Sequence, residues 1–369
     1  MGAGVSSLDR CIGCLLGGAV GDALGAPIEF LSASEIADRF GSSGISGYVP
    51  TSTGRKGWVT DDTQMTLFTA EGLIRAEVKA RCEGTKPNYL AATTAAYLRW
   101  LATQGVPASY KVEGTGWLYQ TKGLHEICAP GRTCINALRR IKPSVSMQAS
   151  NSSKGCGGVM RIAPVGLFGN QAFQGIGADN AVFDLGCDLA RITHGHPTGY
   201  LSAGAFSLLI AHLMRGTDFI DAIQRVVAVL ETYEGSEETC AAIEKAIDLS
   251  FRHPRDILAL RQLGEGWIAE ESLAIAIYCT LSYQDDFRNA VLLAVNHGGD
   301  SDSTGSMTGN LVGVMLGFQT IPRDLLEGLE LKGVVQQVAE DLHNFWGWKF
   351  EVGNAAESDP STAPRSKFS

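Results

Sequence analysis

Apolar residues recur at helical spacing along almost the whole chain. The stretch 217–233 illustrates the pattern, because large apolar side chains share one face of a helix while charged and amide side chains fall elsewhere: Phe219, Ile220, Ile223, Val226, Val227 and Leu230 against Asp221, Gln224 and Arg225. Convincing runs of alternating β-branched residues, which would indicate strands, are absent. The pattern therefore predicts an all-α fold.

The same periodicity gives approximate bounds for the predicted helices. They cover residues 11–24, 63–81, 89–103, 181–192, 200–215, 218–233, 237–251, 268–281, 287–295, 306–318 and 323–345. Three Gly-rich stretches, 40–57, 105–134 and 142–158, are expected to be irregular. Long loops in a compact helical domain usually line a site.

Two of the predicted helices are crowded with small residues, at 17–21 and at 305–317. A glycine costs about 1 kcal/mol relative to alanine at a helix position, so this density needs a physical reason. Close approach of two backbones at the centre of a bundle supplies one. We therefore expect these two helices to form a central pair that brings the ends of the chain together.

The domain organisation follows from the same central pair. No shift in composition marks a linker, and no repeat of fixed period is present. We expect one domain over residues 8–349, a compact orthogonal helical bundle, and a disordered tail over residues 353–369, which is rich in Ser, Pro, Glu and Thr.

Composition and charge narrow the functional classes. The 369 residues are 45% hydrophobic and 19% charged, so the chain can bury a sizeable core. A formal net charge of -9 argues against non-specific binding to nucleic acid or to anionic membrane, which both require a basic surface. No apolar run reaches the roughly 18 residues of a membrane span. We expect that the protein binds neither nucleic acid nor membrane and that it is a monomer.

Nine cysteines, an odd number spread through a large chain, are typical of reduced thiols in a cytoplasmic protein. The pair Cys11-x-x-Cys14 has the spacing of a zinc or redox motif, but no second pair accompanies it; we interpret it as one buried helix face. The apolar segment 11–26 has the character of a secretory leader, but Asp22 interrupts it and Glu29 follows closely, so no signal peptide is expected.

The candidate chemistry begins with the acidic stretch 296–305, which contains Asp300, Asp302 and Ser303. Carboxylates and hydroxyls are hard oxygen donors, which Mg²⁺, Mn²⁺ and Ca²⁺ prefer. The alternative interpretation is that Asp302 or Ser303 simply caps the helix that follows.

A second acidic stretch, 57–66, contains Thr60, Asp61 and Asp62 directly before another predicted helix. A capping box with Asp61 as the cap and Gln64 reaching back would explain one carboxylate, but not its neighbour. If both acidic stretches meet, four carboxylates would repel one another strongly without cations. Together the two stretches predict a centre with two divalent metal ions, which would polarise a substrate oxygen and activate a water.

Three further motifs are candidates for the same pocket. Glu29 follows Pro27 on the loop after the first helix, where the alternative is a solvated loop residue. The loop Gly155, Cys156, Gly157, Gly158 offers successive backbone N–H groups to a diphosphate. It lacks the spacing of a Walker P-loop, and the alternative is a plain flexible loop. His194, in the motif 193–197, is expected to contact substrate or to be a satisfied structural histidine.

Five motifs in this order make the chain recognisable: GCLLGGAVGDALGAPIEF at 13–30, WVTDDTQM at 58–65, GCGGVMRIAP at 155–164, THGHP at 193–197 and GGDSDSTG at 298–305. The sequence resembles the ADP-ribosylglycohydrolase family. The resemblance implies an all-α domain that holds two Mg²⁺ or Mn²⁺ ions and hydrolyses a glycosidic bond at the anomeric carbon of ADP-ribose.

Carried over by motif, the resemblance also assigns roles. The metal ligands would be Thr60, Asp61, Asp62, Asp300, Asp302 and Ser303. Either Glu29 or Asp62 would act as acid or base, residues 155–158 would hold the diphosphate, and His194 would line the cleft. Two positions depart from the family pattern: Ser303 stands where Thr is common, and Cys156 stands where Asn is common.

The resemblance favours a hydrolase that removes ADP-ribose from modified proteins, with arginine as the modified residue, by attack of water at the anomeric carbon. The partners would be an ADP-ribosylated protein and the ADP-ribose product. One alternative is a non-catalytic member that binds ADP-ribose or has a structural, crystallin-like role. The other is a hydrolase of another ADP-ribose conjugate or nucleotide-sugar.

Overall fold

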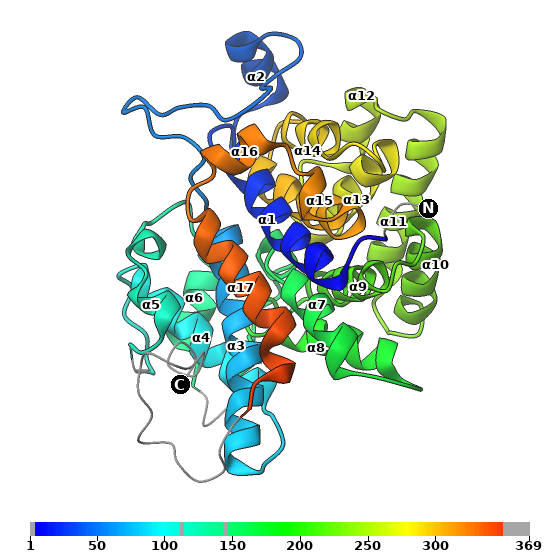
Figure 1. Ribbon diagram of the computed structural model, residues 1–369. Helices are drawn as coiled ribbons and strands as arrows, with labels where there is room; N and C mark the ends of the chain where they lie inside the picture. Colours follow the sequence, from blue (N-terminus) through cyan, green and yellow to red (C-terminus); the bar gives the residue numbers. More distant parts are fainter. Residues whose placement is uncertain (1–3, 111–113, 143–146, 350–369) are drawn as a thin grey trace.

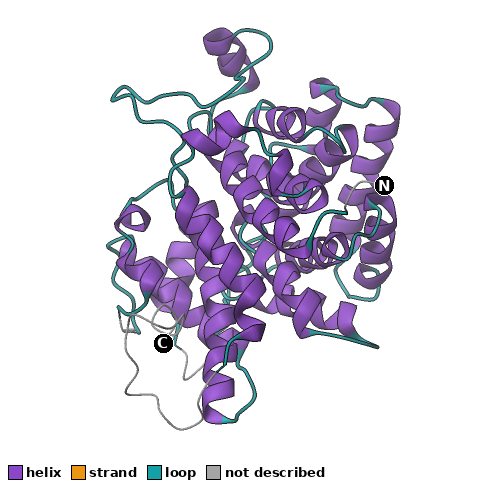
Figure 2. Ribbon diagram, viewed as in Figure 1, coloured by secondary structure: helices purple, strands orange, loops and turns teal. Residues whose placement is uncertain are grey.

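In the computed structural model, the described residues are 4–110, 114–142 and 147–349. Over these ranges the chain is helical and contains no named strand, which confirms the predicted all-α class (Figure 2). The longer helices are α1 (Ser7–Gly25), α3 (Asp61–Glu83), α4 (Tyr89–Thr103), α8 (Ala178–Arg191), α9 (Pro197–Met214), α10 (Phe219–Leu230), α11 (Glu237–Arg252), α13 (Ala269–Ser282), α15 (Ser301–Leu316) and α17 (Lys332–Asn344). The shorter ones are α2 (Ala33–Phe40), α5 (Trp117–Gln120), α6 (Arg132–Arg140), α7 (Ala163–Ala172), α12 (Ile257–Leu260), α14 (Phe287–Val295) and α16 (Arg323–Gly328).

The centre of the bundle is the antiparallel pair of α1 and α15, which lie side by side in Figure 1. Their glycines face one another so closely that added methyl groups would not fit. A Cβ on Gly17 would lie 2.3 Å from the carbonyl oxygen of Gly309, and one on Gly21 would lie 1.9 Å from that of Gly305. The small-residue stripes thus form the predicted central pair.

This pairing places the C-terminal end of α1 next to the N-terminal end of α15. At the C-terminal end of α1, a Cβ on Gly25 would lie 2.4 Å from the backbone nitrogen of Asp302. The turn that carries Glu29 therefore leaves α1 directly beside the first residues of α15.

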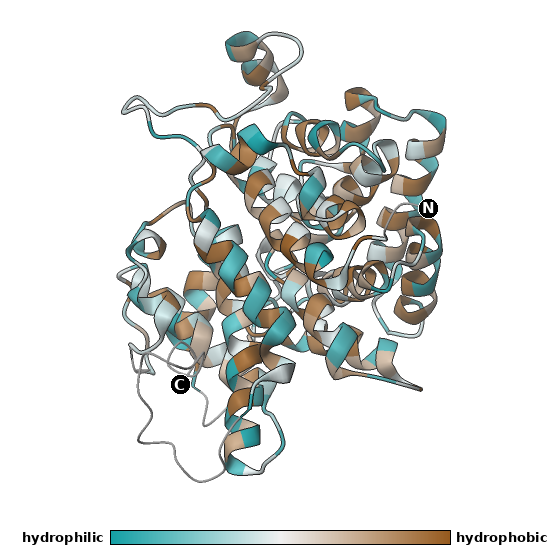
Figure 3. Cartoon of the chain, in the orientation of Figure 1, coloured by the Kyte–Doolittle hydropathy of each residue, from teal (hydrophilic) through white to brown (hydrophobic). Residues whose placement is uncertain are grey.

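The remaining helices enclose the pair. Helices α3, α13, α14 and α17 pack against α1 or α15, while α7, α8 and α9 form a second group that lies below α1 and α15 in Figure 1. Figure 3 shows hydrophilic and hydrophobic residues alternating around α17, as expected of an amphipathic helix that covers a core. The core itself includes large buried aromatic side chains such as Trp100, Tyr97 and Phe68.

The predicted helix 323–345 is wrong as a single element, because it is divided into α16 and α17. Between them the N–H of Glu330 donates to the carbonyl of Gly57 over 2.8 Å, and Leu331 adopts a positive φ of 57°. A contact with a distant loop thus interrupts a continuous apolar pattern. The stretches expected to be irregular also contain helix, since α5 and α6 fall within or next to 105–134.

The alternative interpretation of Asp61 as the cap residue of a capping box is wrong. Thr60 occupies the N-cap of α3, and its hydroxyl accepts the N–H of Asp62 over 3.3 Å, while the Gln64 amide donates to the Glu126 carbonyl instead. Helix α15 begins earlier than predicted, with Asp300 at its N-cap position and without a cap hydrogen bond from that side chain. Both acidic stretches therefore begin helices.

The other predictions concern the pair Cys11 and Cys14, membrane-spanning helices and the C-terminal tail. Cys11 and Cys14 are free and buried on α1, as interpreted from the sequence. No helix among the described residues is both long enough and apolar enough to cross a membrane. The tail 353–369 lies outside the described residues, and the proposed domain division stays a prediction.

Candidate metal centre

The acidic residues of three separate segments lie together at the junction of α1, α3 and α15. Glu29, Asp300 and Asp302 each offer a carboxylate oxygen, and these three oxygens lie within 4.8 Å of one another. Glu29 is held on its turn by its backbone N–H, which donates to the Gly25 carbonyl over 2.9 Å. The structure thus joins the first motif to the last one.

The second acidic stretch adds two buried carboxylates from the first turn of α3. Burial, and then the negative charge of Asp302, raise the pKa of Asp62 well above its usual value. Burial and Asp302 also raise the pKa of Asp61, although the N–H of Gly131, which donates to Asp61 over 3.1 Å, acts in the opposite direction. The four predicted aspartates therefore form one mutually repelling group.

One oxygen in this group has no partner. Asp62 is 2% exposed, and its Oδ1 atom has no hydrogen-bond partner among the described residues. A buried polar atom without a partner costs free energy, so such atoms are normally satisfied by hydrogen bonds or by an ion. The orphaned oxygen and the hard donors around it fit a divalent cation such as Mg²⁺ or Mn²⁺.

Glu29 differs from the aspartates because it is only partly buried. Burial first, and then the charges of Asp302 and Asp300, raise its pKa to about 10. In the metal-free centre Glu29 therefore keeps its proton at neutral pH. The centre thus combines a protonated carboxyl group with buried carboxylate oxygens that fit a cation.

Asp22 belongs to the centre, although no role was predicted for it. It is fully buried on α1 and accepts hydrogen bonds from the backbone N–H and hydroxyl groups of both Thr60 and Thr63. Burial and the charge of Asp302 raise its pKa to about 7, against the effect of these donors. The sequence signal that could have indicated Asp22 is an aspartate inside an otherwise apolar helix.

Ser303 follows Asp302 directly, but its hydroxyl contacts two sulfur atoms. It is 3.7 Å from both Cys156 Sγ and Met160 Sδ. The Thr60 hydroxyl donates its proton to Asp22 over 2.9 Å and accepts the N–H of Asp62, so one lone pair of its oxygen is still available. Their roles as metal ligands stay predictions.

The glycine-rich loop lies against the acidic group as a short 3₁₀ turn, Cys156–Gly158. The Cys156 thiol donates to Asp300 Oδ2 over 2.7 Å, so the residue that departs from the family pattern contacts the centre. The N–H of Cys156 already donates to the Trp267 carbonyl, and that of Gly155 to Ser153 Oγ. Two of the four N–H groups expected to hold a diphosphate therefore have protein acceptors.

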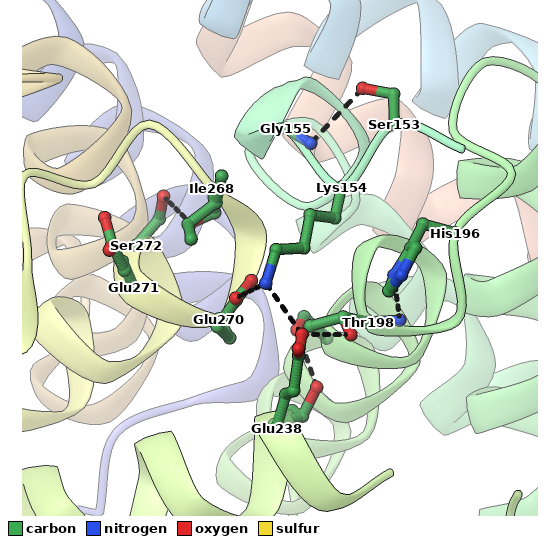
Figure 4. A network of polar contacts seen from close by, with 12 residues as sticks. Ser153, Lys154, Gly155, His196, Thr198, Glu238, Ile268, Glu270, Glu271 and Ser272 are labelled. Carbon is green, nitrogen blue, oxygen red and sulfur yellow. Dashed lines mark hydrogen bonds and ion pairs between the residues drawn. The ribbon is translucent and has the colours of Figure 1, made fainter. Parts of the chain in front are cut away.

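The lysine before this loop pairs with two glutamates that do not belong to the acidic group. Figure 4 shows Lys154 extending between Glu238 and Glu270, with which it forms ion pairs. Glu238 also accepts the Thr198 hydroxyl over 2.8 Å. Lys154 thus anchors the loop to α11 and α13, and its charge is compensated by these two glutamates.

His194 lies beneath the loop. Its Nδ1 is 2.8 Å from the hydroxyl of Thr193, and a Cβ on Gly157 or Gly158 would lie 3.2 Å from its ring. Burial, and then the charge of Arg161, lower its pKa to about 3, so it is neutral at physiological pH. These contacts favour the structural one of the two interpretations left open for this residue.

Comparisons with known proteins agree with the motifs. The family model described as ADP-ribosylglycohydrolase matches residues 4–350. The chain is 28% identical to an ADP-ribosyl-[dinitrogen reductase] glycohydrolase of Rhodospirillum rubrum, covering 89% of this chain and 93% of the relative. It is 26% identical to the ADP-ribosylarginine hydrolase Tri1 of Serratia proteamaculans, covering 91% and 79% respectively.

A solved structure shares the fold. It is titled "ADP-ribosylglycohydrolase-related protein complex" and aligns with a TM-score of 0.63 at 24% identity, covering 92% of this chain and 98% of the other. The family model matches almost the entire chain, including the ordered acidic and glycine-rich motifs, so it shows family membership and not only a shared fold. This chain belongs to the ADP-ribosylglycohydrolase family of hydrolases, as those motifs predicted.

Proposed function

We propose that this protein removes ADP-ribose from modified arginine residues of proteins by metal-dependent hydrolysis. The observation that carries the proposal is the meeting of Glu29, Asp300 and Asp302 beside the orphaned oxygen of Asp62. Such a group is unfavourable in a protein that has no cation to bind. The names of the two relatives, one of them an ADP-ribosylarginine hydrolase, support the substrate.

In this proposal the residues of α3 and α15 hold two Mg²⁺ or Mn²⁺ ions. The ligands would be Thr60, Asp61, Asp62, Asp300, Asp302 and Ser303. When bound, the ions supply Lewis acidity toward the ribose oxygens and lower the pKa of a bound water. Asp22, which holds Thr60 and Thr63, would keep the first turn of α3 in place.

The bond changes are those of glycoside hydrolysis. The water oxygen joins the anomeric carbon, the bond from that carbon to the arginine nitrogen breaks, and one water proton ends on the leaving nitrogen. Glu29 or Asp62 carries that proton; we assign it to Glu29, because the unpaired Asp62 oxygen suits a metal better. The net charge of -9 also favours a cationic guanidinium over an acidic acceptor.

The loop Gly155, Cys156, Gly157 and Gly158 would lie along the diphosphate, with His194 supporting it from below. Because the N–H groups of Gly155 and Cys156 are engaged elsewhere, the Gly157 and Gly158 N–H groups would make the contacts. We further propose that the protein acts as a monomer in the cytoplasm. Its nine cysteines are all free thiols, which is typical of a reducing compartment.

Release of ADP-ribose tests the proposal. The purified protein, stripped of metal and then supplied with Mg²⁺ or Mn²⁺, is incubated with an arginine-ADP-ribosylated protein and, in parallel, with a serine-linked one. We expect ADP-ribose from the arginine substrate in the presence of metal and none in excess chelator. Release from neither substrate, with metal bound, would favour the non-catalytic or nucleotide-sugar alternative.

A further inference from the structure

An exposed aromatic residue follows Glu29 directly. Phe30 is 66% exposed and stacks on Trp267, with ring centroids 5.3 Å apart and planes inclined by 17°. Its backbone has a φ of 67°, in the left-handed region. A large side chain is strained in that region, so another interaction must hold it there.

The stack is the interaction that offsets this cost. An aromatic pair contributes stability beyond the area that it buries, and this contribution acts against the backbone cost. Because the other face of Phe30 is open to solvent, the ring adds little to the core. Its main contact fixes the direction of the chain immediately after Glu29.

The partner ring is itself tied to the acidic group. Trp267 donates its indole N–H to Glu265 over 3.1 Å, and its carbonyl accepts the N–H of Cys156. The carbonyl of Glu265 accepts the N–H of Asp300 over 2.8 Å. The segment under Phe30 is therefore the same segment that positions Asp300.

The other side of the turn is held by a backbone contact. The N–H of Gly299 donates to the carbonyl of Leu31 over 3.3 Å. With this bond and the stack, the residues on the C-terminal side of Glu29 are joined both to the start of α15 and to the loop before α13. Glu29 then has its carboxyl group held beside Asp300 and Asp302.

We propose that Phe30, through its stack on Trp267, is a positioning residue for Glu29. The inference rests on the proposed hydrolase function and adds to it the contact that keeps the carboxyl group of Glu29 at the reacting atoms. The role assigned to Phe30 is therefore to hold the backbone beside Glu29 and not to take part in the bond changes. Displacing a reacting group by about 1 Å can reduce the rate on the order of 100-fold.

Kinetics of Phe30→Ala, Phe30→Tyr and Glu29→Gln, alone and combined, test this assignment. We expect Phe30→Ala to lower kcat at least about tenfold with KM changed less than about twofold, because positioning affects the reaction rather than binding. Phe30→Tyr keeps a ring for stacking and should stay within about twofold of the unchanged protein. Phe251→Ala, at an exposed aromatic on α11, is the matched control and should have no effect.

The combined variant decides whether Phe30 acts through Glu29. If it does, Phe30→Ala should cause no further loss of kcat in the Glu29→Gln background. Losses that multiply, a rise in KM with unchanged kcat, or failure of Phe30→Tyr to restore the rate would each overturn the proposal.

A second measurement does not depend on activity. Amide hydrogen exchange over the turn 26–31 should accelerate in Phe30→Ala and remain slow in Phe30→Tyr and Phe251→Ala. If the unchanged protein releases no ADP-ribose, the proposed function fails, whereas exchange still tests the contact itself. Equal exchange in all variants would contradict the positioning role whatever the activity.

Discussion

Asp22 on α1 accepts hydrogen bonds from both the backbone N–H and the hydroxyl of Thr60, the residue that caps α3. Thr63, one turn further along α3, donates to the same carboxylate through its own N–H and hydroxyl. The position of the helix that carries Asp61 and Asp62 is therefore fixed by a side chain of the central pair.

Asp22→Asn should destabilise the protein, because the amide group replaces one acceptor oxygen with a donor and leaves buried donors unpaired. An unsatisfied buried polar group costs about 1–3 kcal/mol, and we expect a loss of free energy of unfolding in this range. Urea denaturation, followed by helical circular dichroism, measures it. The control is Asp38→Asn on the exposed surface of α2, which should leave the midpoint unchanged. Equal midpoints for both variants would contradict the role of Asp22.

Asp22 also shows why part of the centre was missed in the sequence. An aspartate on a small-residue helix could equally face solvent at the edge of the helix, and the identity of its four donors depends on the packing of α1 against α3. The acidic pairs were easier to recognise, because Asp61 next to Asp62 and Asp300 close to Asp302 have more charge than a helix cap needs.

The sequence predicted those parts of the fold that depend on the local pattern of residues. It did not predict those that depend on contacts between distant residues. The glycines that face one another in α1 and α15 were visible as two small-residue stripes, and the helix bounds of 89–103 and 287–295 agree with the structure. The break before α17 was not visible, because it depends on a hydrogen bond between Glu330 and Gly57. Periodicity contains no information on that contact.

Asp302→Ala should abolish turnover and weaken metal binding. Asp302 has an oxygen within 4.8 Å of those of Glu29 and Asp300, and its charge raises the pKa of Asp22, Asp61 and Asp62. Titration calorimetry with Mn²⁺ and the ADP-ribose release assay measure the two effects. Asp285→Ala, at an exposed acidic residue, is the control and should change neither quantity. Turnover retained in Asp302→Ala would remove this residue from the centre.

The stability of the metal-free protein should fall as the pH rises from about 7 to about 9. Glu29 has a pKa raised to about 10 when folded, well above the value near 4.3 of an unfolded chain, so its contribution is complete at low pH and is lost as the pH rises toward 10. Asp22, with a pKa of about 7, loses its contribution by the lower end of this range. His194 is neutral in both the folded and the unfolded protein above pH 7, so it does not contribute to the change of stability with pH.

Saturating Mg²⁺ should remove most of this pH dependence, because ionised carboxylates bind the cation instead of repelling one another. The difference in thermal midpoint between Mg²⁺-loaded and chelator-treated protein should therefore grow from pH 7 to pH 9. Differential scanning calorimetry at three pH values measures it. A difference that stays constant, or shrinks with pH, would mean that the acidic group does not bind the ion.

Gly21→Ala tests whether the close contact of α1 and α15 builds the centre. The added methyl carbon would lie 1.9 Å from the carbonyl oxygen of Gly305, so the two helices must move apart. Overpacking of this kind costs about 3 kcal/mol. Because α15 begins with the carboxylates Asp300 and Asp302, its displacement should also weaken Mn²⁺ binding.

Gly333→Ala is a matched control, since it makes the same change inside α17, where a Cβ would meet no atom within 4 Å. Alanine is the better helix former by about 1 kcal/mol, so this variant should be as stable as the unchanged protein or more stable. Urea midpoints and Mn²⁺ titrations of both variants make the comparison. If Gly21→Ala matched Gly333→Ala in both measurements, the separation of α1 and α15 would not control the centre. If it lost stability but bound Mn²⁺ unchanged, the carboxylates of α15 would be held by other contacts, chiefly those of Asp300 with Glu265 and Cys156.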